Sequence, residues 1–312
     1  MSRRLKLRMI SAATMLITAS SIFAANPASA ATQWGSYQWS SAPQNLLVYK
    51  NLVTSATGTN WSTFVDRAAG GWTRAPVSIT TITETQGVDR RKCPAQTGTV
   101  EVCNNTYGQN GWLGIAQIWT SGNFIVRGTV KLNDTYFNMA AYSSSGWKNL
   151  VTCQEVGHTI GLSHDDTTFG NTNFGTCMDY TSYPDNPGQY FDFTAGLTPT
   201  TDNWSPNGND YALLSCMYAS PGVGCATKTS FGNPPRVAAS VPTGGGPTLH
   251  SGPTDFGIRI PGQVPASEVD PGNTPAEWGK VVALTRDGRG RVYERTVGEG
   301  RKIITEVFWA PQ

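Results

Sequence analysis

The sequence predicts an α+β fold, with a twisted mixed sheet and a few helices, followed by a small C-terminal β segment. Two patterns lead to this prediction. Apolar residues recur at helical spacing in residues 61–71 and 147–162. Runs rich in β-branched residues lie between these two segments and near the C-terminus, and Gly-containing turns separate the last of them. The length suits one large domain, or one domain with an appendage.

Residues 1–30 have the order of a secretory signal peptide. Four basic residues between Arg3 and Arg8 precede an apolar run, residues 9–25, and an A-x-A sequence, residues 28–30, follows it. The apolar run is about 17 residues long, which is the short limit for a membrane span. We therefore expect cleavage after Ala30, export from the cell, and no membrane segment in the mature protein.

The charge balance changes when this leader is removed. All four of its charges are basic, so the mature chain keeps 19 of the 23 Lys and Arg residues against all 21 Asp and Glu residues. A nucleic-acid binder normally carries a clustered excess of positive charge. The sequence therefore predicts no nucleic-acid partner.

The helices and strands of the main domain follow from local patterns. Apolar residues in 45–72 favour helix, although "GTN" at 58–60 interrupts the run and the helix restarts at Trp61. Alternating or β-branched runs predict strands. A helix is expected to end where glycine follows its last apolar turn, at Gly161. The remaining segments are strands at 76–83, 111–120 and 124–134, and a helix at 147–162.

The composition shifts after residue 230. Residues 231–253 are rich in proline and glycine and poor in aromatic residues, which predicts a linker. Residues 254–312 are then expected to form a small β-rich appendage, with an antiparallel meander over 280–309. An alternative role for this tail is attachment to cell wall or glycan through an aromatic platform of Trp278, Tyr293, Phe308 and Trp309.

All six cysteines follow the leader. An even number of cysteines in an exported chain predicts disulfides. No C-x-x-C pair is present to supply two thiolates to a metal, which disfavours a cysteine-ligated zinc site. Pairing between sequence neighbours gives Cys93–Cys103, Cys153–Cys177 and Cys216–Cys225.

The stretch "CQEVGHTIGLSH", residues 153–164, carries the candidate site. Gln154 and His158 are four residues apart on a predicted helix, so their side chains leave the same face. Glu155 lies beside them, and Gly161 lets the chain turn so that His164 can approach. A helix turn and a returning loop bring donors to a zinc ion from different directions and leave a fourth position for water. We expect Gln154, His158 and His164 to bind Zn²⁺ and Glu155 to act as general base.

This stretch resembles the metzincin clan of zinc endopeptidases, whose pattern is H-E-x-x-H-x-x-G-x-x-H followed by a methionine turn. Met178, in "TCMDY", matches the turn methionine. The resemblance covers about residues 40–225 and implies a metzincin-like catalytic domain over residues 31–230, with a helix at 205–218 after the methionine turn. It implies a catalytic role for Tyr180, as a transition-state donor or extra ligand, and an edge strand at 111–120 that binds extended substrate.

The departure from the pattern is Gln154, where the clan has histidine. An amide oxygen is a weaker zinc ligand than imidazole. Three hypotheses follow from this departure. In the first, Gln154 coordinates the ion through its carbonyl oxygen. In the second, a carboxylate from Asp165, Asp166 or Asp179 replaces it, and in the third the site holds metal poorly. Glu155 favours a working site, because a buried carboxylate without a nearby cation is costly.

The prediction is a secreted zinc-dependent endopeptidase that acts on peptide or protein substrates. The alternative is a catalytically inactive protease-like fold that binds peptides or proteins outside the cell. A Cys153–Cys177 bridge would join the start of the helix to the methionine turn and hold the floor of the metal pocket.

Overall fold

The computed structural model describes residues 31–74, 76–83, 89–171, 173–185, 203–219, 270, 272–298 and 300–311. The expected signal peptide and the expected linker at 231–253 lie outside these residues. Within them, no helix has both the length and the apolar character that crossing a bilayer requires.

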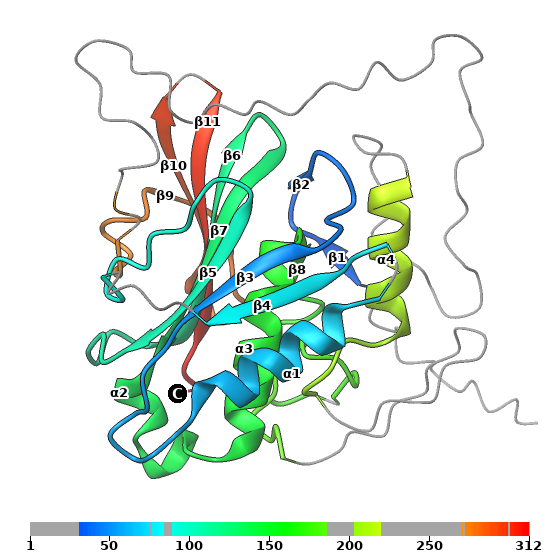
Figure 1. Cartoon of the computed structure of the whole chain (residues 1–312). Coiled ribbons are helices and arrows are strands. Elements are labelled where there is room, and N and C mark those ends of the chain that lie inside the picture. The colour runs from blue at the N-terminus through cyan, green and yellow to red at the C-terminus, as the bar shows by residue number, and fades with distance from the viewer. Residues whose placement is uncertain are drawn as a thin grey trace, which may run out of the picture.

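A nine-stranded mixed sheet forms the centre of the molecule (Figure 1). Its order is β4-β3-β5-β7-β6-β11-β10-β9, and β2 pairs with the start of β7. The strands β4, β3, β5 and β7 are parallel to one another, whereas β6, β11, β10 and β9 continue the sheet in antiparallel pairs. Two short strands, β1 and β8, pair separately. The strands are β1 (Thr32–Gln33), β2 (Gln38–Trp39), β3 (Leu46–Asn51), β4 (Ile79–Thr83), β5 (Thr99–Asn105), β6 (Trp112–Ser121), β7 (Phe124–Asn133), β8 (Leu162–Ser163), β9 (Lys280–Leu284), β10 (Gly290–Gly298) and β11 (Arg301–Trp309).

Two longer helices cover one face of this sheet. Helix α1 (Trp61–Trp72) packs on β3 and β4, helix α3 (Ser145–Thr159) packs on β6, β7 and β11, and the two helices contact each other. The remaining helices are α2 (Asp134–Phe137), the 3₁₀ turn η1 (Ala140–Tyr142) and α4 (Gly208–Ala219). An α+β fold with a mixed sheet is confirmed.

Local chemistry fixes both ends of α3. The side chain of Ser144 caps its start by accepting a hydrogen bond from the Trp147 amide at 3.3 Å. Its end is set by Gly161, whose φ of +97° is accessible to glycine at little cost. A Cβ at this position would also lie 2.5 Å from the carbonyl oxygen of Tyr37. The chain can therefore reverse at Gly161 and return toward the helix as β8.

Glycines in the sheet let α3 approach it closely. A Cβ on Gly114 of β6 would lie 2.5 Å from Val151 and 2.8 Å from Glu155 Oε1. A Cβ on Gly128 of β7 would lie 3.2 Å from Thr159. The side chains on the inner face of α3 therefore rest directly on the strand backbone, and this places them near β11 as well.

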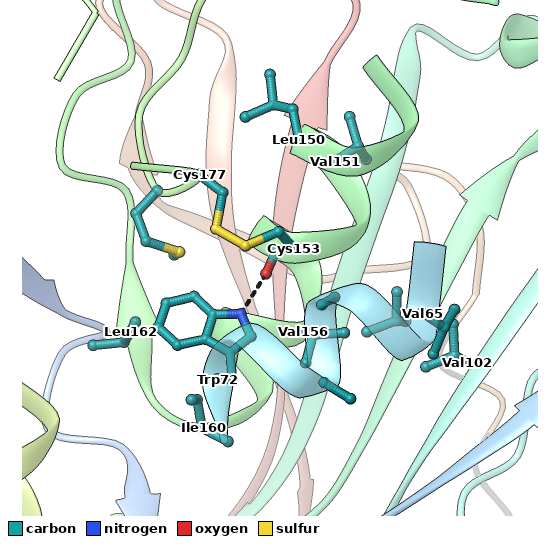
Figure 2. Packing of buried hydrophobic residues seen from close by; sticks show 14 of the residues in the cluster. Val65, Trp72, Val102, Leu150, Val151, Cys153, Val156, Ile160, Leu162 and Cys177 are labelled. Atoms are coloured by element: carbon teal, nitrogen blue, oxygen red, sulfur yellow. Dashed lines mark hydrogen bonds between the residues drawn. A yellow bond between two sulfur atoms is a disulfide. The ribbon is translucent and has the colours of Figure 1, made fainter. Parts of the chain in front are cut away.

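The main hydrophobic core lies between the helices and the sheet. Figure 2 shows its centre, where the Trp72 ring of α1 lies among Ile160, Leu162 and the Cys153–Cys177 disulfide. Trp72 is fully buried, and its indole N–H donates a hydrogen bond to the carbonyl oxygen of Cys153 at 2.8 Å. This bond fixes α1 to the turn of α3 that carries Gln154.

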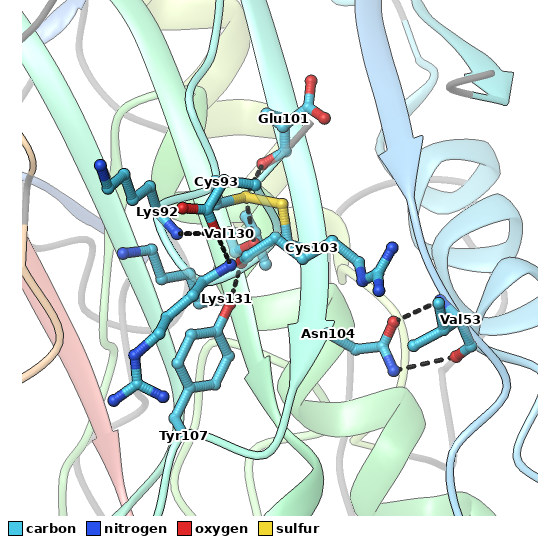
Figure 3. The surroundings of a disulfide bond; sticks show 12 residues. Val53, Lys92, Cys93, Glu101, Cys103, Asn104, Tyr107, Val130 and Lys131 are labelled. Atoms are coloured by element: carbon cyan, nitrogen blue, oxygen red, sulfur yellow. Dashed lines mark hydrogen bonds between the residues drawn. A yellow bond between two sulfur atoms is a disulfide. The ribbon is translucent and has the colours of Figure 1, made fainter. Parts of the chain in front are cut away.

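The opposite face of the sheet is covered partly by residues 89–98, which the Cys93–Cys103 disulfide holds to β5 (Figure 3). Nearby, Asn104 and Val53 exchange two hydrogen bonds of 2.8 and 2.9 Å through the Asn104 amide group. Cys93–Cys103 and Cys153–Cys177 are confirmed as disulfides. Cys216 is disulfide-bonded, and its expected partner Cys225 lies outside the described residues.

Most predicted elements are confirmed, with one exception. Residues 46–51 form strand β3 instead of the predicted helix, because this short run pairs on both sides, with β4 and with β5. Strand β5 and the short elements β1, β2, β8, α2 and η1 were not predicted. The predictions for α1, β4, β6, β7, α3, α4 and the β9–β11 meander are confirmed within a few residues at their ends.

The C-terminal strands continue the main sheet. β11 pairs with β6 along its whole length and with β10 on its other side. The prediction that residues 111–120 form a substrate-binding edge strand is therefore wrong, because β6 is paired on both sides. The aromatic residues proposed as a platform are buried instead: Trp278, Tyr293, Phe308 and Trp309 are each at most 6% exposed.

Candidate metal centre

Helix α3 and strand β8 bring the three predicted ligands together. His158 Nε2 and His164 Nε2 lie 3.1 Å apart, and His164 Nε2 lies 3.0 Å from Gln154 Oε1. All three residues are buried, and none is more than 3% exposed. The spacing of Gln154 and His158 on one helix face and the reversal at Gly161 produce this convergence, as the sequence predicted.

The outer nitrogens show where the imidazole protons lie. His158 Nδ1 is 2.8 Å from the carbonyl oxygen of Leu162, which can only accept, so this nitrogen carries the proton. His164 Nδ1 lies 3.0 Å from Glu306 Oε1, although the geometry is not that of a hydrogen bond. A carboxylate oxygen at this distance would repel a nitrogen lone pair, so a proton on Nδ1 is favoured. Each histidine therefore directs an unprotonated Nε2 into the site.

A backbone contact orients Gln154 in the same way. Its amide nitrogen donates to the Cys177 carbonyl oxygen at 2.7 Å, which leaves Oε1 facing His164. Three acceptor atoms thus converge without a proton between them, so their lone pairs repel one another. Burial lowers the pKa of His158 and lowers that of His164 to about 3. Protonation of an imidazole therefore does not relieve the repulsion between these lone pairs at neutral pH.

These donors fit a divalent metal ion. Bond lengths of about 2.0–2.2 Å in tetrahedral geometry place neighbouring ligand atoms about 3.3 Å apart. The separations of 3.0 and 3.1 Å are close to this value. Imidazole nitrogen and amide oxygen are suitable donors for Zn²⁺, and three protein donors are the number found in catalytic zinc sites.

The aspartates considered as replacement ligands lie elsewhere. Asp165 Oδ1 accepts the Thr32 amide at 3.1 Å, and Asp179 Oδ2 accepts the Phe174 amide at 2.9 Å. Asp166 Oδ1 accepts the Thr168 amide at 2.9 Å. Among the described residues, the metal-competent group of His, Cys, Asp and Glu comprises His158, His164 and Glu306, and none of these aspartates belongs to it.

Glu306 is a site residue that the sequence analysis missed. It lies on β11, it is fully buried, and it accepts a hydrogen bond from Ser163 Oγ at 2.9 Å. Burial works to raise the pKa of Glu306, but the two histidines and Arg291 outweigh it and lower that pKa. The available signal was one acidic residue within the apolar run "IITEVFW", far from the motif in sequence.

Glu155 is beside the ligands and unusually placed for a carboxylate. It is fully buried, and among the described residues neither of its side-chain oxygens has a hydrogen-bond partner. Burial, with a smaller effect from the Glu306 charge, raises its pKa well above the usual range. Its side chain lies over Gly114, where the missing side chain of the glycine leaves room.

Tyr180 and Met178 support the site from the methionine turn. The Tyr180 ring lies 4.6 Å from the His164 ring and stacks on Phe308 at 4.4 Å. Its hydroxyl donates to the Val307 carbonyl oxygen at 2.6 Å, so donation to a substrate requires that bond to break. Met178 is fully buried, and its sulfur and the Trp72 ring together fill the space beside Gly157.

The N-terminal segment covers the other side of the histidines. The Trp34 ring lies 5.6 Å from the His158 ring, edge to face. A pocket of about 280 Å³ opens beside Trp34, Ser163 and Arg291, the last two of which contact Glu306. The pocket reaches these two neighbours of Glu306, whereas Glu306 and the histidines themselves are buried.

Comparisons with known proteins do not assign the chain to a family. No family model matches the chain, and no curated protein matches it. Among solved structures, it is similar to a chain of the "GM1 bound form of the ECX AB5 holotoxin" at a TM-score of 0.36 and 14% identity, covering 61% of this chain and 87% of that one. A similarity this low does not establish a shared fold or a shared function.

Proposed function

We propose that this chain is an exported zinc-dependent hydrolase that cleaves peptide bonds. The observation that carries the proposal is the convergence of three acceptor atoms, from Gln154, His158 and His164, beside a carboxylate that has no partner. The sequence pattern of residues 154–164 supports peptides as the substrate class. The leader pattern and the two disulfides are compatible with an extracellular location.

Each residue has a defined part in this proposal. Gln154 Oε1 and the Nε2 atoms of His158 and His164 would hold the ion. When bound, Zn²⁺ would lower the pKa of water and polarise the substrate carbonyl group. Glu155 would accept a proton from the attacking water and return it to the leaving amine. Its buried position excludes other water, and its two unpaired oxygens are free to accept and return the proton.

The Glu155→Gln variant tests the catalytic part. Glutamine has the same shape but cannot take a proton, so we expect turnover of an unstructured protein substrate to fall by about 10²–10⁴-fold. Zinc content by elemental analysis is expected to remain at one ion per chain. The Gln154→Ala variant is the complementary control, because it is expected to lose zinc and turnover together.

A second candidate function is non-catalytic. β6 is paired on both sides, and Gln154, Glu155 and His158 are fully buried, which favours an ion that stabilises a binding protein. Wild-type protein that holds one zinc ion and has no turnover, with Glu155→Gln indistinguishable from it, would support this candidate. Wild-type protein without zinc and without turnover would contradict the hydrolase and favour a binding protein that needs no metal.

A further inference from the structure

We infer that Glu306 is a positioning residue of the metal centre, so that the C-terminal strand β11 is required for zinc binding. The inference rests on the proposed function, because it assigns the carboxylate that orients the two imidazole ligands. Glu306 lies 142 residues beyond His164 in the chain and reaches the site only because β11 pairs with β6.

The contacts of Glu306 all lie on the outer side of the ligands. Its Oε1 is 3.0 Å from His164 Nδ1, and its Oε2 is 3.4 Å from His158 Nδ1. A single carboxylate therefore contacts the outer nitrogen of both histidines, while their Nε2 atoms face each other and Gln154. A carboxylate in this position fixes the ring orientation and tautomer of a metal-binding histidine, which here applies to His164. The His158 Nδ1 proton is donated to the Leu162 carbonyl oxygen, so Glu306 acts on that ring through its charge.

The same carboxylate is itself held firmly. Ser163 Oγ donates to Oε1 at 2.9 Å, and the Arg291 guanidinium lies 3.8 Å from it. Ser163 precedes His164 in the chain, and Arg291 lies on the neighbouring strand β10. The orientation of both imidazoles is thus coupled to β8, β10 and β11 together.

The strand that carries Glu306 is an internal strand of the main sheet. β11 lies between β6 and β10, and Ile303, Ile304, Val307 and Phe308 on it are each at most 1% exposed. Displacing it would expose these side chains and break pairing on both edges. Glu306 is therefore a permanent part of the site, and its position relative to the histidines is set by the sheet register, in which it pairs with Ala116 of β6.

Charge supports the same assignment. The site contains two fully buried acidic side chains, Glu155 and Glu306. A divalent cation between the three inner donors would favour the ionised form of both. An orienting carboxylate also makes each imidazole a better donor to the ion.

The test is the zinc affinity of Glu306→Gln, measured by competition with a chromophoric chelator. Loss of an outer carboxylate typically lowers metal affinity by about 10–100-fold, and we expect a fall in this range. The matched control is Glu294→Gln on β10, a carboxylate that pairs with Lys302 at 2.9 Å and is expected to leave the affinity unchanged.

Two further measurements separate positioning from a general structural effect. The melting temperature of metal-free protein is expected to change little in Glu306→Gln, while the increase on adding zinc shrinks. The visible absorption spectrum of the Co²⁺-substituted protein is expected to shift, because its ligand field changes when the imidazoles reorient. If Glu306→Gln does not fold, Ser163→Ala removes one contact to the carboxylate, and we expect weaker zinc binding there too.

The outcomes distinguish this inference from the proposed function. Wild-type protein that binds no zinc overturns both. Wild-type protein that binds zinc, with equal affinity in Glu306→Gln, overturns the positioning role alone. Loss of zinc binding in Glu306→Gln with full affinity in Gln154→Ala also overturns the positioning role. In that case the ion would lie on the Glu306 side of the histidines, and Glu306 would itself be a metal ligand.

Discussion

Lys131 is a fully buried cation on the face of the sheet away from α3 (Figure 3). Its ammonium group donates to the Gly272 carbonyl oxygen at 3.1 Å and to Asn273 Oδ1 at 2.8 Å. These contacts do not offset burial, which lowers the pKa of Lys131 to about 7 from 10.5. The lysine therefore loses its proton in the folded state well before it does in the unfolded state.

The sign of the pH effect follows. Between pH 7 and 10 the unfolded chain binds more protons at this residue than the folded chain, so the free energy of unfolding rises with pH. We expect wild type to gain stability relative to Lys131→Met across this window, by about 1.4 kcal/mol per pH unit at most. Denaturant unfolding of both proteins at several pH values measures the difference. Lys302→Met, at a more exposed lysine, is expected to show no such rise.

At the candidate metal centre, individual residues were predictable where the constraint is local. The four-residue spacing of Gln154 and His158 and the turn at Gly161 are short-range properties, and the structure places these residues as expected. Glu306 was not predictable in this way. Its role depends on which strand pairs with β6, and that choice is decided by packing across the whole sheet.

At the scale of the elements, the packing of α3 depends on a glycine. A Cβ on Gly157 would lie 2.6 Å from the Trp72 ring and 2.8 Å from Met178 Sδ. Gly157→Ala is expected to lower the free energy of unfolding by about 1–3 kcal/mol through overpacking. Gly70→Ala is the matched control in α1, where no atom lies within 4 Å of the new Cβ, and alanine is expected to stabilise by about 0.5–1 kcal/mol. Equal effects of the two substitutions would contradict this packing argument.

The Cys153–Cys177 disulfide joins α3 to the methionine turn, beside the Gln154–Cys177 hydrogen bond. Replacing both cysteines by serine is expected to cost about 3 kcal/mol in stability and to weaken zinc binding. The bridge Cys93–Cys103 is a suitable control, since its removal has a similar expected cost but lies on the other face of the sheet. Elemental analysis and thermal unfolding of both double variants measure the two effects. Unchanged zinc affinity without the Cys153–Cys177 bridge would show that the bridge does not support the site.

The element boundaries reveal what local patterns leave open. Residues 46–51 begin with three apolar residues, and this short run was predicted as helix. Pairing with β4 and β5 makes it a strand instead, which a local pattern does not reveal. By contrast, α1 and α3 were predictable because an apolar stripe at helical spacing is buried along each whole helix. The class of fold was predictable for the same reason, whereas the order of strands was not.

At the scale of the whole molecule, residues separated by a long stretch of chain form one sheet. β11 pairs with β6 over residues 301–309, and its side chains enter the cores on both faces. All six cysteines precede residue 232, so no disulfide links the C-terminal strands to the rest of the protein. Packing, strand pairing and side-chain hydrogen bonds such as Ser163–Glu306 and Tyr180–Val307 hold them in place.

This arrangement predicts the behaviour of a chain cut in two. If a specific protease site is placed within residues 232–253, cleavage is expected to leave both fragments bound to each other, because separation would expose Val307 and Phe308, which are fully buried. Size-exclusion chromatography should show a single species at the mass of the uncut chain, and zinc should stay with it. The fragments should part only in the denaturant range where the fold is lost. An N-terminal fragment that elutes alone and still unfolds cooperatively would mean that β11 is an accessory strand and that Glu306 is not essential to the centre.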